Sequence, residues 1–392
     1  MLDLVVIGAG PAGLSAAIAC RESDLKVLVI DEFVKPGGRL LGQLHQEPTG
    51  EWWNGIEETE ILLNKAYALH TDIRCGVSCH HVEKTDTGFI VHTNKGLFET
   101  AKVLIATGAA ETAAPIPGWT LPGVMSIGAA QVMTNVHRVK VGNRGIIAGV
   151  NVLSAAIARE LQLAGIDLHS MALPVKNTVT KEHANPYAVM DGLVRVAHLA
   201  PSAFLRFGSK FAQSKKVREL AVKFYPRGGV KMWGMPIHVR KAIKEINGTD
   251  KVESVTMVKV TPDGDIIPGT EEIIKVDFVC IAGGLYPLSE LASVVGCPFR
   301  FVEELGGHVP VHNERMETPV EGLYVAGNIT GIESAKVARA QGKVAGYSIA
   351  NNTAKLDQAI ADVKETRENA SIQFHPLIKA GRAKIHRAFE AY

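Results

Sequence analysis

The sequence has few cysteines, almost no net charge and no long apolar run, and each shortage excludes a class of protein. The chain has only five cysteines among 392 residues, an odd number whose spacing gives no disulfide framework (Cys20, Cys75, Cys79, Cys280 and Cys297). A formal net charge of +2 argues against a protein built mainly to grip nucleic acid. No apolar run reaches the length of a membrane-spanning helix, so we expect no transmembrane segment.

What remains is the composition of a globular protein. Hydrophobic residues make up 46% of the chain and charged residues 21%, and the length allows two domains, each with its own core. Met1 directly precedes the first strand that we expect, which leaves no room for a signal or transit peptide. Together with the cysteine count, this predicts a cytoplasmic protein in a reducing environment.

A glycine-rich turn follows the first expected strand, Leu2–Ile7, and opens a helix of small residues. Its glycines have the spacing of a dinucleotide-binding fingerprint, in which each has its own role. Gly8 allows the tight turn, Gly10 lets a pyrophosphate approach the main chain, and Gly13 lets the helix pack closely on the strand. The phosphate charge would lie at the helix N-terminus, where free N–H groups point outward.

An acidic residue completes this pattern. Asp31 ends the second expected strand, Lys26–Ile30, and is placed to accept hydrogen bonds from a ribose hydroxyl. The combination of strand, turn, helix and acid predicts a dinucleotide site, and an ordinary βαβ turn without a ligand is the alternative. We expect FAD rather than NAD, because supporting segments occur elsewhere in the chain.

Three further segments bear on this site. Paired glycines in Pro36–Gln43 could let a loop pass closely over a flavin, although a plain surface turn has the same composition. Lys102–Ala109 reads as a buried strand and a tight turn, and Gly322–Asn328 as a strand whose end meets a helix at Glu333–Asn351. Trp52 and its neighbour Trp53 are better explained by one ring in a core and one at an interface than by an aromatic cage.

A second βαβ pattern begins at Arg144, but its glycine turn is degraded. Asn151 and Ser154 stand where a working fingerprint has glycines, and their side chains would obstruct a pyrophosphate and the helix packing. The next expected strand, Ile166–Met171, does not end in Asp, Glu or Arg. We therefore expect a Rossmann-like domain that has lost NAD(P) binding.

Residues 175–225 interrupt this second domain with a basic, mostly helical insertion. Its expected helical part, Pro186–Phe224, places six cations among apolar residues (Arg206, Lys210, Lys215, Lys216, Arg218 and Lys223). Such a stretch can seat a partner subunit or lie on a membrane, and a solvated helix face is the bland alternative.

The sequence predicts an α/β protein with two Rossmann-like dinucleotide-binding domains of three layers, the second inserted into the first. We expect the FAD-binding domain at 1–115 and 290–355, the NAD(P)-binding-like domain at 116–289, and a polar C-terminal tail at 356–392. The proline-rich linker that follows Ala109 marks the first boundary.

Several motifs carry a resemblance to known proteins. They are the linker run Pro117–Met125, the nearby Gly128–Gln131, Glu304–Gly307, and Met316–Thr318 followed by Val320–Gly322. With these, the chain resembles two-dinucleotide flavoproteins of thioredoxin-reductase-like architecture from its start to about Ala350. More narrowly, it resembles the α-type subunits of heteromeric amine and imino-acid dehydrogenases. These include the opine oxidase A subunit, the hydrogen cyanide synthase B subunit, dye-linked proline dehydrogenase α and the N-terminal part of sarcosine oxidase α.

The resemblance implies bound FAD and a set of residues that hold it. The expected cofactor-binding positions are Gly8, Gly10, Pro11, Ala12, Gly13, Asp31, Glu32, Gly38, Arg39, Gln43, Val82, Ala106, Thr107, Gly108, Gly327, Asn328, Ala335 and Lys336. His45, with Gln43 and Lys336, is placed nearest the flavin ring by position only. Asn328 departs from the family's Asp and keeps hydrogen bonding without the charge. No cysteine follows Cys297, which excludes the iron–sulfur segment of some relatives.

Catalytic residues cannot be assigned from spacing. Cys75 and Cys79 read as packing residues, so dithiol exchange is not expected, and the adjacent His80 and His81 lack a carboxylate partner for a metal. We expect the FAD-binding subunit of a heteromeric dehydrogenase or oxidase for an amine, imino acid or opine, with substrate oxidation on a partner chain. Two alternatives stay open: a self-sufficient NAD(P)H-dependent flavin reductase, and a structural subunit that holds a nucleotide and catalyses nothing.

Overall fold

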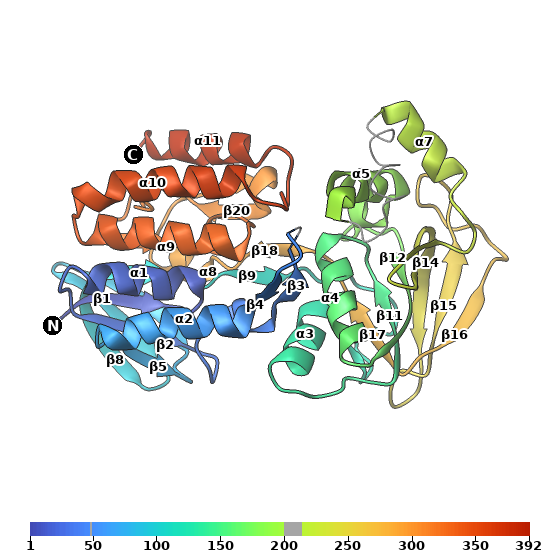
Figure 1. Cartoon of the computed structure of the whole chain (residues 1–392), viewed down its shortest axis with the longest axis horizontal. Coiled ribbons are helices and arrows are strands. Elements are labelled where there is room, and N and C mark those ends of the chain that lie inside the picture. The colour runs from blue at the N-terminus through green and yellow to red at the C-terminus, as the bar shows by residue number, and fades with distance from the viewer. Residues whose placement is uncertain (48, 200–213) are drawn as a thin grey trace. The chain divides into compact units, whose positions relative to one another are not determined.

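The structure is a computed structural model that describes residues 1–47, 49–199 and 214–392. The chain folds into two compact α/β units, of which the second is inserted into the first (Figure 1). Unit 1 contains Met1–Gln43, Trp53–Ala110 and Leu285–Tyr392. Unit 2 contains Leu44–Trp52 and Glu111–Gly284. The predicted fold class, two Rossmann-like α/β domains with one inserted into the other, is confirmed.

Parallel strands form the centre of unit 1. Their order is β5-β2-β1-β8, and β21 pairs with the other side of β8 (β1 Leu2–Ile7, β2 Val27–Asp31, β5 Asp72–Cys75, β8 Gly96–Ile105 and β21 Leu323–Val325). The first half of β8 instead pairs antiparallel with β7, Gly88–Thr93, which pairs with β6, Cys79–Thr85. One long strand therefore joins the parallel sheet to a small meander.

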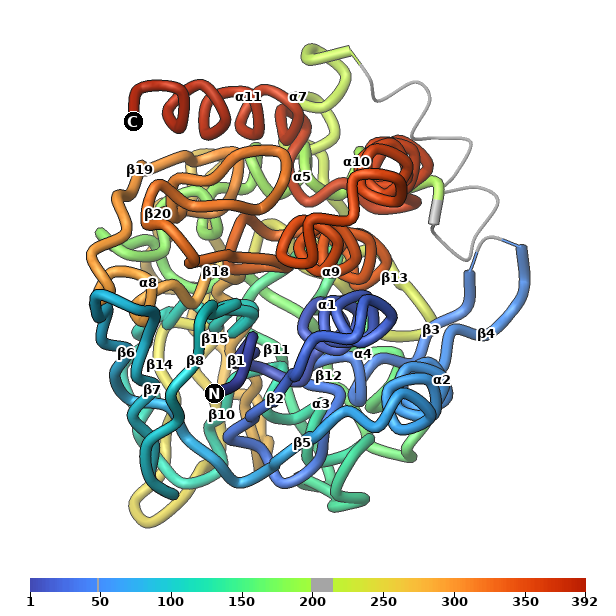
Figure 2. Tube along the Cα trace, turned by 90° about the vertical axis from the view of Figure 1, so that its left-hand side faces the viewer, coloured from blue at the N-terminus to red at the C-terminus, as the bar shows by residue number. Residues whose placement is uncertain are grey.

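Helices cover one face of the parallel sheet and the meander covers the other. On β1, Leu4 and Val6 belong to a core shared with the helices, whereas Val5 and Ile7 belong to a core shared with the meander. This alternation is the two-residue period of a strand that is buried on both faces. The helices of unit 1 are α1 Pro11–Arg21, α2 Gly55–Ala68, α8 Glu290–Val294, α9 Ala335–Ile349, α10 Thr353–Glu368 and α11 Ile378–Phe389. Figure 2 shows α1, α9 and α10 side by side.

The last residues of the chain are folded parts of unit 1. The expected polar tail, 356–392, contains most of α10 and all of α11, and both helices pack on unit 1. Leu356 and Val363 on α10 are buried in the helix-side core. Ile378 and Ile385 on α11 pack against the hairpin of β19, Phe299–Val302, and β20, Gly307–Pro310, through buried side chains such as Val302 and Val309 (Figure 2).

Helices α1 and α9 touch main chain to main chain through glycines. A Cβ on Gly342 would lie 2.1 Å from the carbonyl oxygen of Ala12, and one on Gly346 would lie 2.6 Å from that of Ala16. Because these two glycines are one helical turn apart, they form a groove along α9 that receives α1. This contact places the N-termini of both helices at the same end of unit 1.

We predict that Gly342→Ala destabilises the protein by about 1–3 kcal/mol, because the added methyl group has backbone in its way and the helices must separate. The free energy of unfolding in urea, followed by circular dichroism, measures this. Gly192→Ala is the matched control, since Gly192 lies in α5, Pro186–Val196, and its Cβ would meet only the end of Arg195 at 3.8 Å. The control should be neutral or stabilising by about 0.5–1 kcal/mol. Equal effects of the two substitutions would contradict the packing argument.

Unit 2 is built on one mixed sheet with the order β10-β17-β11-β12-β14-β15-β16. The first strands run parallel, and β14 begins an antiparallel meander (β10 Val124–Ser126, β11 Arg144–Ala148, β12 Asp167–Pro174, β13 Val230–Met232, β14 Met235–Asn247, β15 Ser254–Lys259, β16 Glu272–Lys275 and β17 Phe278–Ile281). The prediction that the strand at β12 ends at Met171 is wrong, because the strand continues to Pro174. Helices α3, Ile127–Asn135, and α4, Val152–Leu163, follow β10 and β11.

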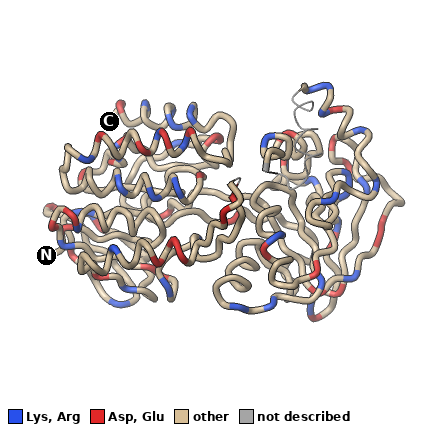
Figure 3. Tube along the Cα trace, in the orientation of Figure 1, with Lys and Arg blue, Asp and Glu red and all other residues tan. Residues whose placement is uncertain are grey.

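The predicted basic insertion is helical where it is described. It contains α5 and α7, Lys215–Lys223, and Arg218 on α7 forms an ion pair with Asp191 on α5. Arg206 and Lys210 lie outside the described residues. Figure 3 shows that acidic and basic residues are interspersed within each unit. Among the helices of the described ranges, none combines the length and the apolar character needed to cross a membrane.

A buried carboxyl group joins three elements of unit 2. Glu160 on α4 accepts hydrogen bonds from Gln131 and Asn135 at 2.8 Å each and from the main-chain N–H of Leu44 at 3.1 Å. Leu44 begins the short hairpin of β3, Leu44–Gln46, and β4, Trp52–Asn54. Burial raises the pKa of Glu160 to about 7, against the opposing effect of its three hydrogen bonds.

This pKa predicts a pH-dependent stability. Between pH 4.5, the ordinary pKa, and pH 7, folded Glu160 keeps a proton that the unfolded chain has lost. The free energy of unfolding therefore falls as the pH rises through this window, by on the order of 3 kcal/mol. Glu160→Gln removes the titration, so it should gain stability relative to the wild type between pH 5 and pH 8 in urea denaturation. The exposed Glu182→Gln serves as the control, and a Glu160→Gln difference that is independent of pH would refute the prediction.

Candidate nucleotide-binding site

The glycine turn between β1 and α1 brings three main-chain segments into contact. Gly8 has a φ of +110°, and a Cβ there would lie 2.4 Å from the carbonyl oxygen of Ala106. A Cβ on Gly13 would lie 1.9 Å from the carbonyl oxygen of Gly8. Gly10 differs from both, because a Cβ there meets no heavy atom within 4 Å. Gly8 and Gly13 are therefore required by packing, whereas Gly10 leaves open space beside the start of α1.

The N-terminus of α1 has no side chain that satisfies its N–H groups. Gly10 is the N-cap residue and Pro11 the first helical residue, and no side-chain hydrogen bond or acidic residue occurs in the first turn. The main-chain N–H groups of a first turn have no partner inside the helix. They carry the positive end of the helix dipole, so this terminus is suited to bind a phosphate.

Asp31 connects the end of β2 to the glycine turn. Its Oδ2 accepts a hydrogen bond from the N–H of Ala9 at 2.6 Å, and its Oδ1 accepts one from the N–H of Phe33 at 2.8 Å. Burial raises the pKa of Asp31, and the two hydrogen bonds oppose that rise. Each carboxylate oxygen can accept a further hydrogen bond, so a ribose hydroxyl can be bound here. The neighbouring Glu32 is exposed.

The loop that contains the paired glycines packs on the glycine turn. The N–H of Gly37 donates to the carbonyl oxygen of Ala9 at 2.8 Å, and a Cβ on Gly38 would lie 3.2 Å from the Cα of Gly10. From the same loop, Arg39 donates through Nε to the carbonyl oxygen of Ala109 at 3.1 Å. These contacts favour a loop that covers the site over a plain surface turn.

The residues that end β8 are fixed by contacts with other parts of unit 1. Ala106 is buried and donates its N–H to Ile7 at 2.8 Å, which keeps it beside Gly8. The Thr107 hydroxyl donates to the carbonyl oxygen of Leu288 at 2.6 Å. Gly108 follows with a φ of +78°, and its carbonyl oxygen accepts from Leu288 at 3.1 Å. These residues shape the edge of the site through their main chains.

The turn after β21 also lies against the start of α1. Gly327 has a φ of +82°, and a Cβ there would lie 2.9 Å from the Cβ of Ala12. Asn328 uses its Oδ1 to accept the N–H of Glu333 at 3.2 Å. Its Nδ2 has no hydrogen-bond partner among the described residues and is free to donate to a ligand oxygen. An aspartate at this position would present no such donor.

Helix α9 starts directly after this turn. Ala335 is its first residue, and the hydroxyl of Ser334 accepts the N–H of Val337 at 3.3 Å. Lys336 is exposed, and its Nζ lies 4.9 Å from the centroid of the Trp53 ring. The Trp53 Nε1–H in turn donates to Oε1 of Gln43 at 3.1 Å. Trp53 is buried in the core as predicted, and Trp52 is 53% exposed.

Two further predicted positions lie in other elements. The side chain of Val82 is buried on β6 in the core beneath the meander, so only its main chain could contact a nucleotide. His45 belongs to the part of the hairpin that is grouped with unit 2, where its Nε2 lies 3.5 Å from Oε1 of Glu47.

The second glycine turn is closed by its own side chains. Oδ1 of Asn151 accepts the N–H of Ser154 at 2.9 Å, and the Ser154 hydroxyl accepts the N–H of Asn151 at 2.9 Å. This reciprocal capping box satisfies two of the N–H groups that a phosphate would otherwise use. Gly149 keeps the tight turn, with a φ of +123° and a Cβ position 2.3 Å from the carbonyl oxygen of Ala282. Fold and turn are thus retained, while two N–H groups at the start of α4 are satisfied by side chains of the turn itself.

No cysteine has the character of a redox dithiol. All five are free thiols in the described ranges, and burial raises the pKa of each (Cys20, Cys280 and Cys297 to about 12, Cys79 to about 11, and Cys75). A reactive cysteine needs a lowered pKa, because the thiolate is the nucleophile. In the same ranges, no group of three or more His, Cys, Asp or Glu side chains is arranged to hold a metal ion.

Sequence reasoning missed several residues that support the site. The buried Gln341 holds the turn after β21 in place, because its Oε1 accepts the N–H of Gly327 at 3.0 Å. The spacing of Gly342 and Gly346 on one helix was a usable signal. Arg382 lies in the expected polar tail, and no local sequence pattern indicated its role. Its contact with Thr330 joins segments that are far apart in the chain.

The two Rossmann-like units place the chain in a class of two-domain, dinucleotide-binding folds. The chain belongs to the pyridine nucleotide-disulphide oxidoreductase family, whose sequence pattern matches residues 2–188 and 221–342. It is 27% identical to the opine oxidase A subunit of Agrobacterium tumefaciens, over 92% of this chain and 66% of that protein. It is 24% identical to the hydrogen cyanide synthase component HcnB of Pseudomonas aeruginosa, over 98% of this chain and 77% of that protein.

Solved structures share the fold. L-proline dehydrogenase from P. horikoshii superposes with a TM-score of 0.66 at 21% identity, over 93% of this chain and 58% of that chain. Thioredoxin reductase from T. acidophilum superposes with a TM-score of 0.61 at 22% identity, over 90% of this chain and 99% of that chain. The resemblance predicted from the motifs is confirmed. The chain spans about two thirds of the opine oxidase A subunit and just over half of the proline dehydrogenase chain.

The different surroundings of Gly10 and Gly13 predict different effects of the same substitution. Gly10→Ala should change the free energy of unfolding by less than about 0.5 kcal/mol, because the methyl group meets no protein atom. It should nevertheless weaken dinucleotide binding, because the methyl group stands where a pyrophosphate approaches. Gly13→Ala should destabilise by about 1–3 kcal/mol, because Gly8 blocks its methyl group. Urea denaturation measures the change in stability, and the nucleotide content of the purified variants measures the change in binding. Unchanged nucleotide content in Gly10→Ala would contradict a site at this turn.

Proposed function

We propose that the chain is the FAD-binding subunit of a heteromeric flavin dehydrogenase or oxidase that acts on an amine, imino acid or opine. The observation that carries this proposal is the difference between the two glycine turns. The turn at Gly10 leaves the N-terminus of α1 open, whereas Asn151 and Ser154 cap α4. Of these two turns, the one in unit 1 is the better suited to bind a dinucleotide.

FAD fits the residues of the unit 1 edge. The adenosine ribose would be held by Asp31, the pyrophosphate by the main chain at Gly10 and the first turn of α1, and the flavin end by Asn328 and the start of α9. The open Cβ position of Gly10 and the available Nδ2 of Asn328 are the features that a bound dinucleotide would use. Bound FAD would supply the redox chemistry, so the chain's own residues need only bind, orient and shield it.

The relatives support a role as one subunit of a larger enzyme. Two of them are a subunit of opine oxidase and a subunit of hydrogen cyanide synthase. The buried thiols with raised pKa argue against a disulfide reductase, and the capped α4 argues against a self-sufficient NAD(P)H-dependent flavin reductase. We infer that substrate oxidation takes place on a partner chain.

The first experiment is a visible absorption spectrum of the purified full chain, with chromatography of any nucleotide released on denaturation. We expect the bands of oxidised FAD, and FAD as the released nucleotide. Under anaerobic conditions, these bands should persist when NADH or NADPH is added in excess, because the capping box already uses two of the N–H groups at the start of α4. Gly10→Ala, which should fold normally, is the matched variant and should be purified with less flavin.

Each other outcome points to a different function. Rapid bleaching by NADPH would replace the proposal with a self-sufficient reductase and would mean that unit 2 binds a dinucleotide despite its capping box. A colourless protein that releases only ADP or ATP would indicate a structural subunit. FAD that is present but equally abundant in Gly10→Ala would place the flavin elsewhere on the chain.

A further inference from the structure

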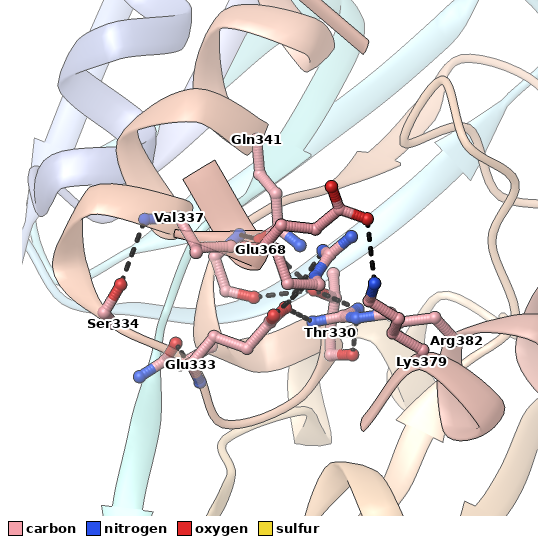
Figure 4. Close-up of polar contacts among 11 residues, drawn as sticks. Thr330, Glu333, Ser334, Val337, Gln341, Glu368, Lys379 and Arg382 are labelled. Atoms are coloured by element: carbon pink, nitrogen blue, oxygen red, sulfur yellow. Dashed lines mark hydrogen bonds and ion pairs between the residues drawn. The ribbon is translucent and has the colours of Figure 1, made fainter. Parts of the chain in front are cut away.

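A buried ion cluster lies behind the turn that leads into α9. Glu333, just before the helix, accepts two hydrogen bonds from Arg367 of α10, at 2.5 and 3.1 Å. Arg382 of α11 also donates to Glu333 (Figure 4). The side chains of all three residues are at most 13% exposed. The last two helices of the chain thus meet the turn through charged groups and not through apolar side chains alone.

Arg382 also holds the turn directly. Its Nη1 donates to the carbonyl oxygen of Thr330 at 2.5 Å and to the Thr330 hydroxyl at 2.9 Å (Figure 4). The Thr330 hydroxyl donates in turn to the carbonyl oxygen of Gly327 at 2.8 Å. The Arg382 guanidinium therefore contacts the turn at Thr330 and at Glu333, and the Thr330 hydroxyl links it to Gly327. These contacts use the forked arrangement of N–H donors that only arginine offers.

The cluster has more positive than negative charge. Two guanidinium groups face one carboxylate, and the two arginines lower the pKa of Glu333 although its burial opposes this, so it stays ionised. His312 and His386 lie beside the cluster, and burial lowers their pKa to about 3 and about 4, so both are neutral at pH 7. The excess charge therefore lies behind the positive end of the α9 dipole, and the two fields add.

Stability alone does not explain this arrangement. A buried ion pair with an extra unpaired charge is costly to desolvate, and apolar residues of the same volume often serve stability as well or better. A second ion pair already joins the same two helices at the surface, where Lys379 of α11 contacts Glu368 of α10 at 2.8 Å (Figure 4). The buried cluster differs from it in one respect, because it reaches the turn that faces the proposed flavin.

We propose that Arg382 is a positioning residue for the flavin end of the unit 1 site, through which α11 fixes the Gly327–Ser334 turn and places a positive field behind it. This inference rests on the proposed function, because it assumes FAD in unit 1. Two consequences follow: slow release of FAD, and a higher reduction potential, since a positive field stabilises the negative charge that reduction adds.

The test compares Arg382→Met, Arg382→Lys and Lys379→Met in the full chain. Arg382→Met leaves the pair between Glu333 and Arg367 intact, so no buried charge loses its last partner. We expect it to release FAD about 10- to 100-fold faster than the wild type, measured after dilution, because a loosened turn misplaces its ligand groups. Its reduction potential, measured by titration against a reference dye, should shift to a more negative value.

The other two variants separate charge from geometry. Arg382→Lys keeps the charge but cannot form the forked bonds, so FAD release should be faster while the potential stays nearer that of the wild type. Lys379→Met, on the same helix, should match the wild type in both measurements, because an exposed ion pair contributes little.

The outcomes distinguish this inference from the proposed function. A wild-type chain without FAD would refute the proposed function. A wild type that holds FAD, with Arg382→Met and Lys379→Met alike in release and potential, would refute only the role of Arg382. If Arg382→Met fails to fold, Thr330→Val decides, because it breaks the path from Arg382 through the Thr330 hydroxyl to Gly327 and leaves every charge in place. Faster FAD release from Thr330→Val than from Lys379→Met supports the inference, and equal release from the two variants overturns it.

Discussion

Contact between main chains at the carboxyl edge of the unit 1 sheet is the constraint on which the rest of the structure depends. The Gly8 turn lies against Ala106, α1 lies against that turn at Gly13, and the segment after β21 lies against α1 at Gly327. A Cβ at any of these glycines would be within 3 Å of another residue. Because the contacts leave no room for side chains, the ends of separate strands and the start of α1 converge on one small region. Parallel topology alone would bring the strand ends to one edge but would not bring them this close.

The same fold gives two helix N-termini with opposite properties. In unit 1 the start of α1 has no side-chain cap, so its N–H groups depend on water or a ligand. In unit 2, Asn151 and Ser154 supply those partners from the chain itself. Asn151 and Ser154 stabilise α4 at these positions, because a good N-cap contributes about 1 kcal/mol. Their side chains also occupy two of the N–H groups that a phosphate would otherwise use. Stability and ligand binding compete for the same N–H groups.

The sequence was sufficient for features that depend on local spacing. Gly8, Gly10 and Gly13 predicted the first turn, and Asn151 and Ser154 predicted that the second turn differs, because each role depends on neighbours within a few residues. The end of β12 was misjudged, since whether a strand continues past Met171 depends on the pairing of β12 with β14, from Ile237 onward, and not on local composition. The two last helices were read as a polar tail because α10 and α11 bury narrow apolar stripes within otherwise charged segments.

The supporting contacts of the site were the hardest to predict. Arg382 and Thr330 are distant in sequence and meet only because α11 packs on the β19–β20 hairpin. Asp31 was expected as a ribose ligand, but nothing in the pattern indicated that its carboxylate also ties Ala9 and Phe33 together. Composition records which groups are polar, whereas their partners are set by the tertiary fold.

The arrangement also bears on how electrons would pass through the proposed flavoprotein. Among the described residues, α4 carries a capping box and the five thiols have raised pKa values, so neither feature favours a second dinucleotide site or a dithiol as an electron acceptor. Electrons that reach a flavin in unit 1 would then have to enter and leave through the substrate, an external acceptor or a partner chain. The residues around the flavin would still determine its affinity and reduction potential. The C-terminal helices take part through Arg382 of α11, which contacts the turn that contains Asn328. A flavin site that relied on a partner chain for substrate oxidation could still set its own affinity and reduction potential.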